Sequence, residues 1–194
     1  MSNATKKTKD LTQLSLLIAL EAVLAFTPLG FIMIPPISIT ILHIPVIIGA
    51  ILMGPTYGGI LGGTFGVLSV IKATFFAASP ADMLFSPFLS GKPIQSLVMS
   101  IVPRILLGMV AAWLYQALKH KMGEIPSIGV SAVVASILHT LLVLGSMWIF
   151  FNAMPLRDVF VTMASLNCIL ETVAAGVVGV AVCRPLMIYL HKGA

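Results

Sequence analysis

Between Leu11 and Ile71 the chain carries a single formal charge, on Glu21. A typical soluble domain is about 25% charged and about 45–50% apolar, whereas this 194-residue chain is 9% charged and 59% hydrophobic. A soluble fold of this size cannot bury so much apolar surface, and a disordered chain would be far more polar. The sequence therefore predicts one all-α integral membrane domain and no separate soluble domain.

Proline and glycine divide the apolar sequence into segments that can each cross a membrane as a helix, which takes about 20 residues. We predict a bundle of about six transmembrane helices over residues 1–194, with spans at about 11–28, 40–53, 56–75, 93–118, 126–151 and 159–190. Two long connections separate them, the first at 29–39 and the third at 76–92. We expect both to be loops on the outer face, where together they form a lid over a pocket.

The positive charges predict the orientation. The net charge of +5 would also suit a nucleic-acid-binding protein, but much of the excess lies in short hydrophilic ends, as in membrane proteins. With the N-terminus inside, the cytoplasmic side holds most of the basic residues, namely Lys6, Lys7, Lys9, Lys119, Lys121, Arg184 and Lys192. We therefore expect a multi-pass protein of the cell membrane with both termini in the cytoplasm.

Ionisable side chains within spans are costly and each is a functional candidate. Arg104 shares one polar face of its helix with Ser96 and Ser100. Its guanidinium could hold a carboxylate of a ligand, or it could form a structural ion pair with Glu171 or Glu21.

Four further residues are candidates for ligand contacts. Asn167 and Glu171 lie one helical turn apart and can bind hydroxyl and amide groups, or join helices to one another. His139 and Thr140 have the same two interpretations.

Lysine and histidine near the ends of spans are open to simpler explanations. Lys72 lies near the outer end of its span, where it can extend to the membrane surface or close the pocket. We expect His43, at the start of the second span, to anchor at the membrane interface.

Small residues predict close helix contacts. Gly58, Gly62 and Gly66 form a ladder with four-residue spacing. On the first span, Ser15 with Ala19 and Ala22 with Ala25 form small patches that can pack internally or dock onto another membrane protein.

The sequence contains no phosphate-binding loop, no zinc-protease motif and no nucleophile elbow. It has no metal-binding spacing of histidines either, and we predict no enzyme activity, no cofactor and no metal. Any role driven by ATP therefore requires partner subunits.

The segment ITILHIPVIIGAILMGPTYGGILGGTFGVLS, at 39–69, resembles the substrate-binding S components of energy-coupling factor (ECF) vitamin transporters. The similarity extends through SPFLSGKP and IVPRILLG to residue 108, and the NxxxE pattern at 167–171 fits the sixth span of that family. Within the family the chain is most similar to the pantothenate type.

The resemblance implies a bundle that binds a water-soluble vitamin near the outer face and docks on a transmembrane coupling subunit with two cytoplasmic ATPases. It implies docking through small residues of the first span, here Ser15, Ala19 and Ala22. For pantothenate, Arg104 would take the carboxylate, and Asn167, Glu171, His139 and Thr140 the polar remainder. Apolar loop residues such as Phe31, Ile34 and Phe85 could cover the gem-dimethyl group. Another vitamin or precursor (hydroxymethylpyrimidine, pyridoxine or folate) and a stand-alone secondary transporter remain alternatives.

Overall fold

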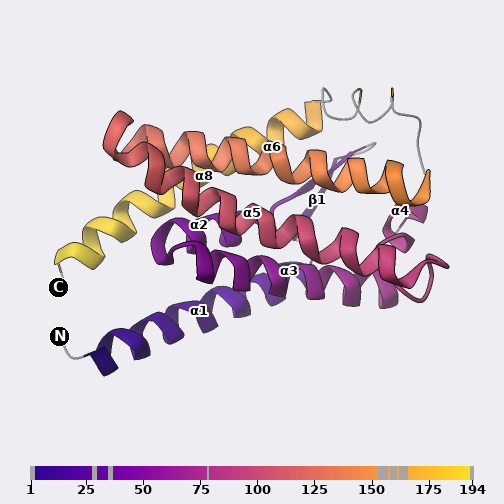
Figure 1. Ribbon diagram of the computed structural model, residues 1–194, viewed down its shortest axis with the longest axis horizontal. Coiled ribbons are helices and arrows are strands. Elements are labelled where there is room, and N and C mark those ends of the chain that lie inside the picture. Colours follow the sequence, from indigo (N-terminus) through magenta and orange to yellow (C-terminus); the bar gives the residue numbers. More distant parts are fainter. Residues whose placement is uncertain are drawn as a thin grey trace.

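The computed structural model describes residues 3–27, 30–34, 37–77, 79–152, 157, 161 and 166–192. The elements, in chain order, are α1 (Asn3–Phe26), β1 (Phe31–Ile34), β2 (Ile37–Thr40), α2 (His43–Met53), α3 (Pro55–Phe75), α4 (Pro80–Met83), α5 (Pro93–Met122), α6 (Glu124–Phe151) and α8 (Leu166–Lys192). The long helices run roughly along one axis, and the two termini lie at the same end of the bundle (Figure 1). We call this the terminal end, and the opposite end, with α4, the loop end.

Several described helices are suited to a membrane. By length and composition, α3, α5, α6 and the segment Cys168–Tyr189 of α8 can each cross one, whereas α2 is a shorter apolar helix. The chain is thus a helical, multi-pass membrane protein.

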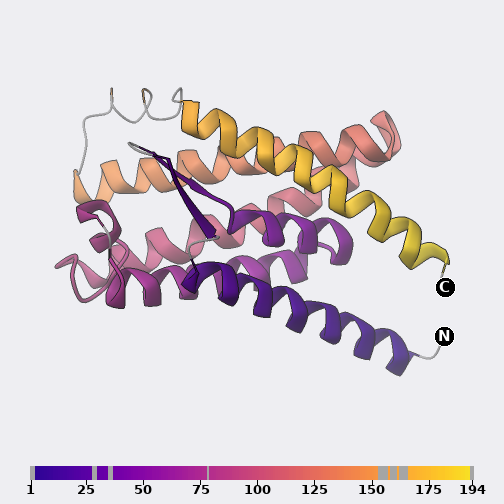
Figure 2. The same ribbon diagram turned by 180° about the vertical axis from the view of Figure 1, so that it is seen from behind.

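The first connection is more ordered than the sequence analysis expected. We predicted a loop at 29–39 in an all-α fold, but β1 and β2 form an antiparallel hairpin in which Phe31 is opposite Thr40 and Ile34 is opposite Ile37. The prediction of a loop is therefore wrong at this segment, while the other elements of the described chain are helical, as predicted. A hairpin pairs part of its own backbone, which an apolar environment requires. Figure 2 shows it between α1 and α8.

Glycine and proline account for two of the sharp breaks between helices. Gly54, between α2 and α3, has a φ of 96°, and Gly123, between α5 and α6, has a φ of 81°. Residues with a Cβ rarely adopt such angles. Pro55 occupies the first turn of α3, where a missing amide hydrogen costs nothing.

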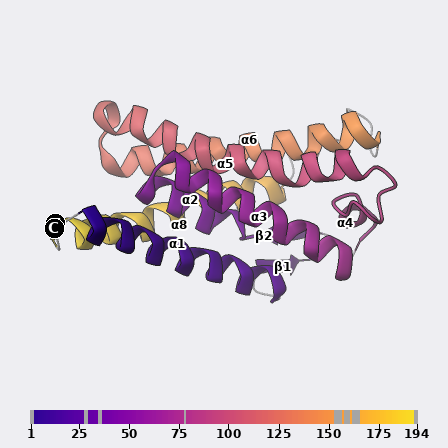
Figure 3. The ribbon, with the colours of Figure 1, turned by 60° about the horizontal axis from the view of Figure 1, so that its bottom comes forward.

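The glycine ladder of α3 packs inside the protein, against α5. A methyl group at Gly58 would lie 2.6 Å from the carbonyl oxygen of Gly108, and one at Gly66 would lie 2.8 Å from that of Ser100. A methyl group at Gly62 would overlap the carbonyl group of Arg104. The two backbones therefore touch, and α5 in turn packs along α6 (Figure 3).

Candidate functional site

Arg104 is buried in the middle of α5, with 6% of its surface exposed. Its Nη1 donates a hydrogen bond to the carbonyl oxygen of Met99 at 2.8 Å. The guanidinium carbon lies 5.5 Å from the centre of the Phe65 ring and 5.0 Å from that of Phe85. Its Nε has no hydrogen-bond partner among the described residues. The group is thus held between two aromatic rings with a donor still available.

The imidazole ring of His139, from α6, also lies beside Phe65, and the centres of the two rings are 6.2 Å apart. Its Nε2 is buried and, within the described part of the chain, has no hydrogen-bond partner. The imidazole is close enough to Arg104 and His43 to interact with them electrostatically. Arg104 and His139, both predicted from the sequence, therefore meet around one aromatic ring.

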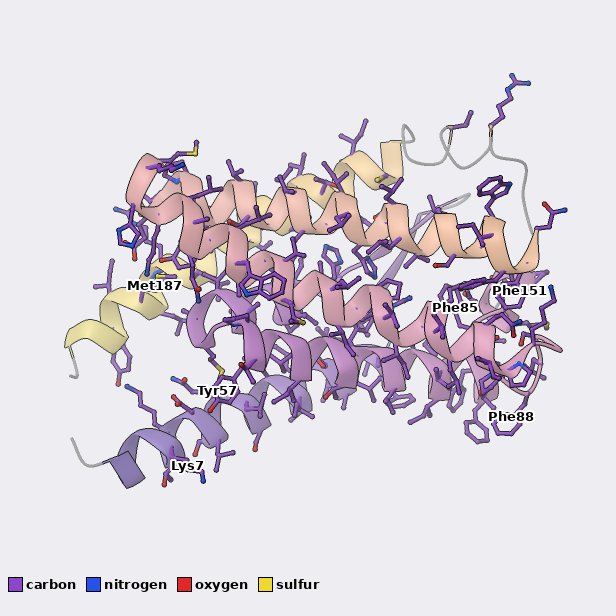
Figure 4. All side chains as sticks on the ribbon, viewed as in Figure 1. Lys7, Tyr57, Phe85, Phe88, Phe151 and Met187 are labelled. Atoms are coloured by element: carbon purple, nitrogen blue, oxygen red, sulfur yellow. The ribbon has the colours of Figure 1, made fainter. Side chains whose placement is uncertain are left out.

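The loop end supplies one wall of this site. Ser96 donates to the carbonyl oxygen of Leu84 at 2.7 Å, and Ser100 donates to that of Phe85 at 3.2 Å. These bonds hold Phe85 against Arg104. The polar face of α5 that the sequence revealed thus anchors the connection at 76–92 as well as carrying Arg104. Phe85 lies near Phe151 at this end, while Lys7, Tyr57 and Met187 lie toward the other (Figure 4).

Three other predicted contact residues lie elsewhere or are already engaged. Thr140 donates to the carbonyl oxygen of Ser136 at 3.2 Å, one turn earlier in its own helix. Lys72 is partly buried near the loop end of α3 and interacts electrostatically with Asp82 of α4. Glu171 is partly buried on α8. These positions leave their contact with a ligand as a prediction.

Asn167 and the docking residues complete the predicted set. The backbone of Asn167 is part of α8, but its side chain is outside the described residues. Ser15 and Ala19 are exposed on α1, and Ala22 packs against the core of the protein. A docking surface on α1 therefore stays a prediction, and Ala22 already has an internal contact.

Some residues of the site were missed or misplaced by sequence reasoning. His43 is buried, with 3% exposed, so the expectation that it anchors at the interface is wrong. It begins α2 directly after the hairpin, inside the bundle. Phe65 was not singled out, although its place between Gly62 and Gly66 on the closely packed part of α3 could have drawn attention to it.

The ion pair between Arg104 and Glu21 that the sequence left open is absent from the described structure. Neither carboxylate oxygen of Glu21 has a hydrogen-bond partner among the described residues. Of the two ion pairs considered for Arg104, the one with Glu21 is therefore not formed among the described residues.

Comparison with known proteins identifies the kind of protein that carries this site. The family model of the substrate-specific component of ECF transporters matches residues 9–190. The chain belongs to this family. It is accordingly a transport component and not an enzyme, as the sequence predicted.

Two relatives of this ECF substrate-specific component extend the comparison. The pantothenic acid transporter PanT of Lactococcus lactis subsp. cremoris (strain MG1363) is 34% identical over 155 residues, which cover 76% of each chain. The solved structure of the S-component for biotin from an ECF-type ABC transporter has a TM-score of 0.60 at 19% identity and covers 95% of both chains. The second likeness supports the fold.

Proposed function

We propose that this chain is the pantothenate-binding S component of an ECF transporter. The observation that carries the proposal is the guanidinium of Arg104, buried between Phe65 and Phe85 with its Nε unpaired among the described residues. Such a group needs an anion, and pantothenate brings a carboxylate. The similarity of this chain to PanT favours pantothenate over other vitamins that carry a carboxylate.

In this proposal the loop end faces outward and the vitamin binds there, near Arg104 and His139. Most described basic residues outside the site are at the terminal end, namely Lys7, Lys9, Lys119, Lys121 and Arg184. Positive charge favours the cytoplasmic side, which supports cytoplasmic termini.

The proposed bundle has six spans: α1, α2, α3, α5, α6 and α8. With 11 residues, α2 rises only about 16 Å, and the hairpin before it would complete that crossing. Non-helical backbone is tolerated at membrane depth where protein covers it or where it lines a cavity. The hairpin, between α1 and α8, is suited to such a place beside the ligand.

Transport in this proposal depends on partners. The bundle would dock, through α1 with Ser15 and Ala19, on a transmembrane coupling subunit that works with two ATPases. Isolation of the chain together with ATPase subunits would support this, whereas uptake by the chain alone would indicate a secondary transporter instead.

A binding measurement on purified protein tests the substrate. Isothermal titration with pantothenate, biotin, pyridoxine, folate and hydroxymethylpyrimidine should give the highest affinity for pantothenate. Arg104→Ala should weaken pantothenate binding by about 2–5 kcal/mol, because it removes the partner of a buried carboxylate. Arg184→Ala, an exposed arginine of α8, is the matched control and should bind as wild type does. Unchanged affinity in the Arg104 variant would remove this residue from the site.

A further inference from the structure

Glu21 is a buried carboxylate that the proposed function does not use. It lies on α1, its side chain is 0% exposed, and neither of its oxygens has a hydrogen-bond partner among the described residues. Burying a carboxyl group without a donor is unfavourable. Because an apolar residue would avoid that penalty, the carboxylate is best explained by a donor that the described residues do not provide.

The packing of α1 gives the depth of Glu21 in the bundle. A methyl group at Gly49 of α2 would lie 2.9 Å from Cδ1 of Leu17 and 3.7 Å from Cγ of Leu61. Leu17 therefore lies beside α2 and α3 at this level. Residues four apart share a helix face, so Glu21 continues that face one turn closer to the loop end. The same step along α3 leads from Leu61 to Phe65.

This register places Glu21 at the level of the site already described. The ring of Phe65 lies beside the guanidinium of Arg104, from α5, and beside the imidazole of His139, from α6. At this level, α5 and α6 contribute two nitrogen atoms without a hydrogen-bond partner among the described residues, Nε of Arg104 and Nε2 of His139. Helix α1 contributes the two carboxylate oxygens of Glu21, which also have none. A ligand that satisfies them all has a carboxylate at one end and hydrogen-bond donors at the other.

We propose that Glu21 accepts hydrogen bonds from the hydroxyl groups of the ligand whose carboxylate Arg104 holds. The inference rests on the proposed function, because pantothenate has its two hydroxyls at the opposite end from its carboxylate. A cationic ligand would suit Glu21 but would meet the like charge of Arg104. Glu21 is therefore a specificity-determining residue, and it selects neutral donors.

The test compares pantothenate with an analogue in which both hydroxyls are replaced by hydrogen. Wild-type protein should prefer pantothenate by about 10- to 100-fold, the range for two buried hydrogen bonds. In Glu21→Leu this preference should fall by about 10-fold or more. Pantothenate would lose the hydrogen bonds of its hydroxyls, whereas the analogue has no hydroxyls and would bind as before. Arg104→Ala should weaken both ligands and leave their ratio unchanged.

Two further variants guard against a folding defect and a general charge effect. Glu21→Gln keeps the size and one acceptor oxygen, and should reduce the preference by a smaller factor than leucine does. Glu124→Gln removes an exposed carboxylate of α6 and should keep the wild-type ratio. Thermal unfolding without ligand should show Glu21→Leu at least as stable as wild type, since no hydrogen bond is lost.

The outcomes separate the two proposals. If wild-type protein does not bind pantothenate, the proposed function is refuted, and the contact assigned to Glu21 is refuted with it. If wild type prefers pantothenate and both Glu21 variants keep the same ratio, whatever their absolute affinities, only the assignment of Glu21 is refuted.

Discussion

Replacing Gly62 with alanine tests whether the contact between α3 and α5 positions Arg104. The added methyl group would overlap the Arg104 carbonyl group and would lie 2.9 Å from the Cα of Ile105. Both are backbone atoms, which cannot rotate away as a side chain could. The helices must therefore separate, and the guanidinium must move with α5.

Two opposing terms set the magnitude. Alanine is favoured over glycine within a helix by about 1 kcal/mol, whereas overpacking a close contact costs about 1–3 kcal/mol and occasionally more. Since the obstacle is backbone, we expect the upper part of that range and a net loss of about 1–2 kcal/mol. Gly63→Ala is the matched control, because its methyl group would lie 3.8 Å from the side chain of Ile105. It should be neutral or stabilising by up to about 1 kcal/mol.

Thermal unfolding of both variants in the same detergent measures the difference, and pantothenate titration measures its effect on the site. Gly62→Ala should unfold at a lower temperature than Gly63→Ala and bind pantothenate more weakly. Equal stability and equal affinity of the two variants would show that the backbones of α3 and α5 do not touch at Arg104.

Two other predictions concern the loop end and the thiols. Ser86 is fully buried, and its Oγ lies 2.9 Å from Oγ1 of Thr74 and accepts a hydrogen bond from the amide of Phe88 at 3.3 Å. Ser86→Ala should therefore destabilise the protein by about 1–3 kcal/mol, measured by thermal unfolding. An unchanged unfolding temperature would contradict this anchoring role. Cys168 and Cys183 both lie on α8, 15 residues apart, which is too far for a disulfide between them. Denatured, unreduced protein should therefore take up two alkylating groups by mass spectrometry, whereas a mass without alkylation would indicate a disulfide.

The membrane class and the importance of Arg104 could be predicted because both follow from local chemistry. Placing a charged side chain within an apolar span costs so much free energy that Arg104 is a functional candidate from the sequence alone, whatever the arrangement of the helices. The glycine ladder likewise predicts a close contact, but four-residue spacing does not say which helix is opposite. Only the structure shows that Gly62 meets the backbone of Arg104.

Phe65 and the hairpin could not be predicted in the same way. Phe65 is one of ten phenylalanines in an apolar chain, and nothing local distinguishes it. Phe85 was predicted as a loop residue over the ligand but not as a neighbour of Arg104, and the side chains of Phe31 and Ile34 lie outside the described residues. Pro35 and Pro36 indicate a break in helix, but the pairing of β1 with β2 depends on backbone groups that find each other across that break. His43 lies at the start of a helix, where an interface position is expected, and the hairpin before it places that start inside the bundle.

The direct backbone contact along the glycine ladder also limits how this protein can move. Where no side chains separate two helices, they cannot slide or tilt past each other without steric overlap, so α3 and α5 form one rigid unit. Arg104 is carried by that unit. Any widening that admits or releases a solute must therefore come from the other elements around it, such as α1, which meets α2 through the side chain of Leu17 and not through bare backbone.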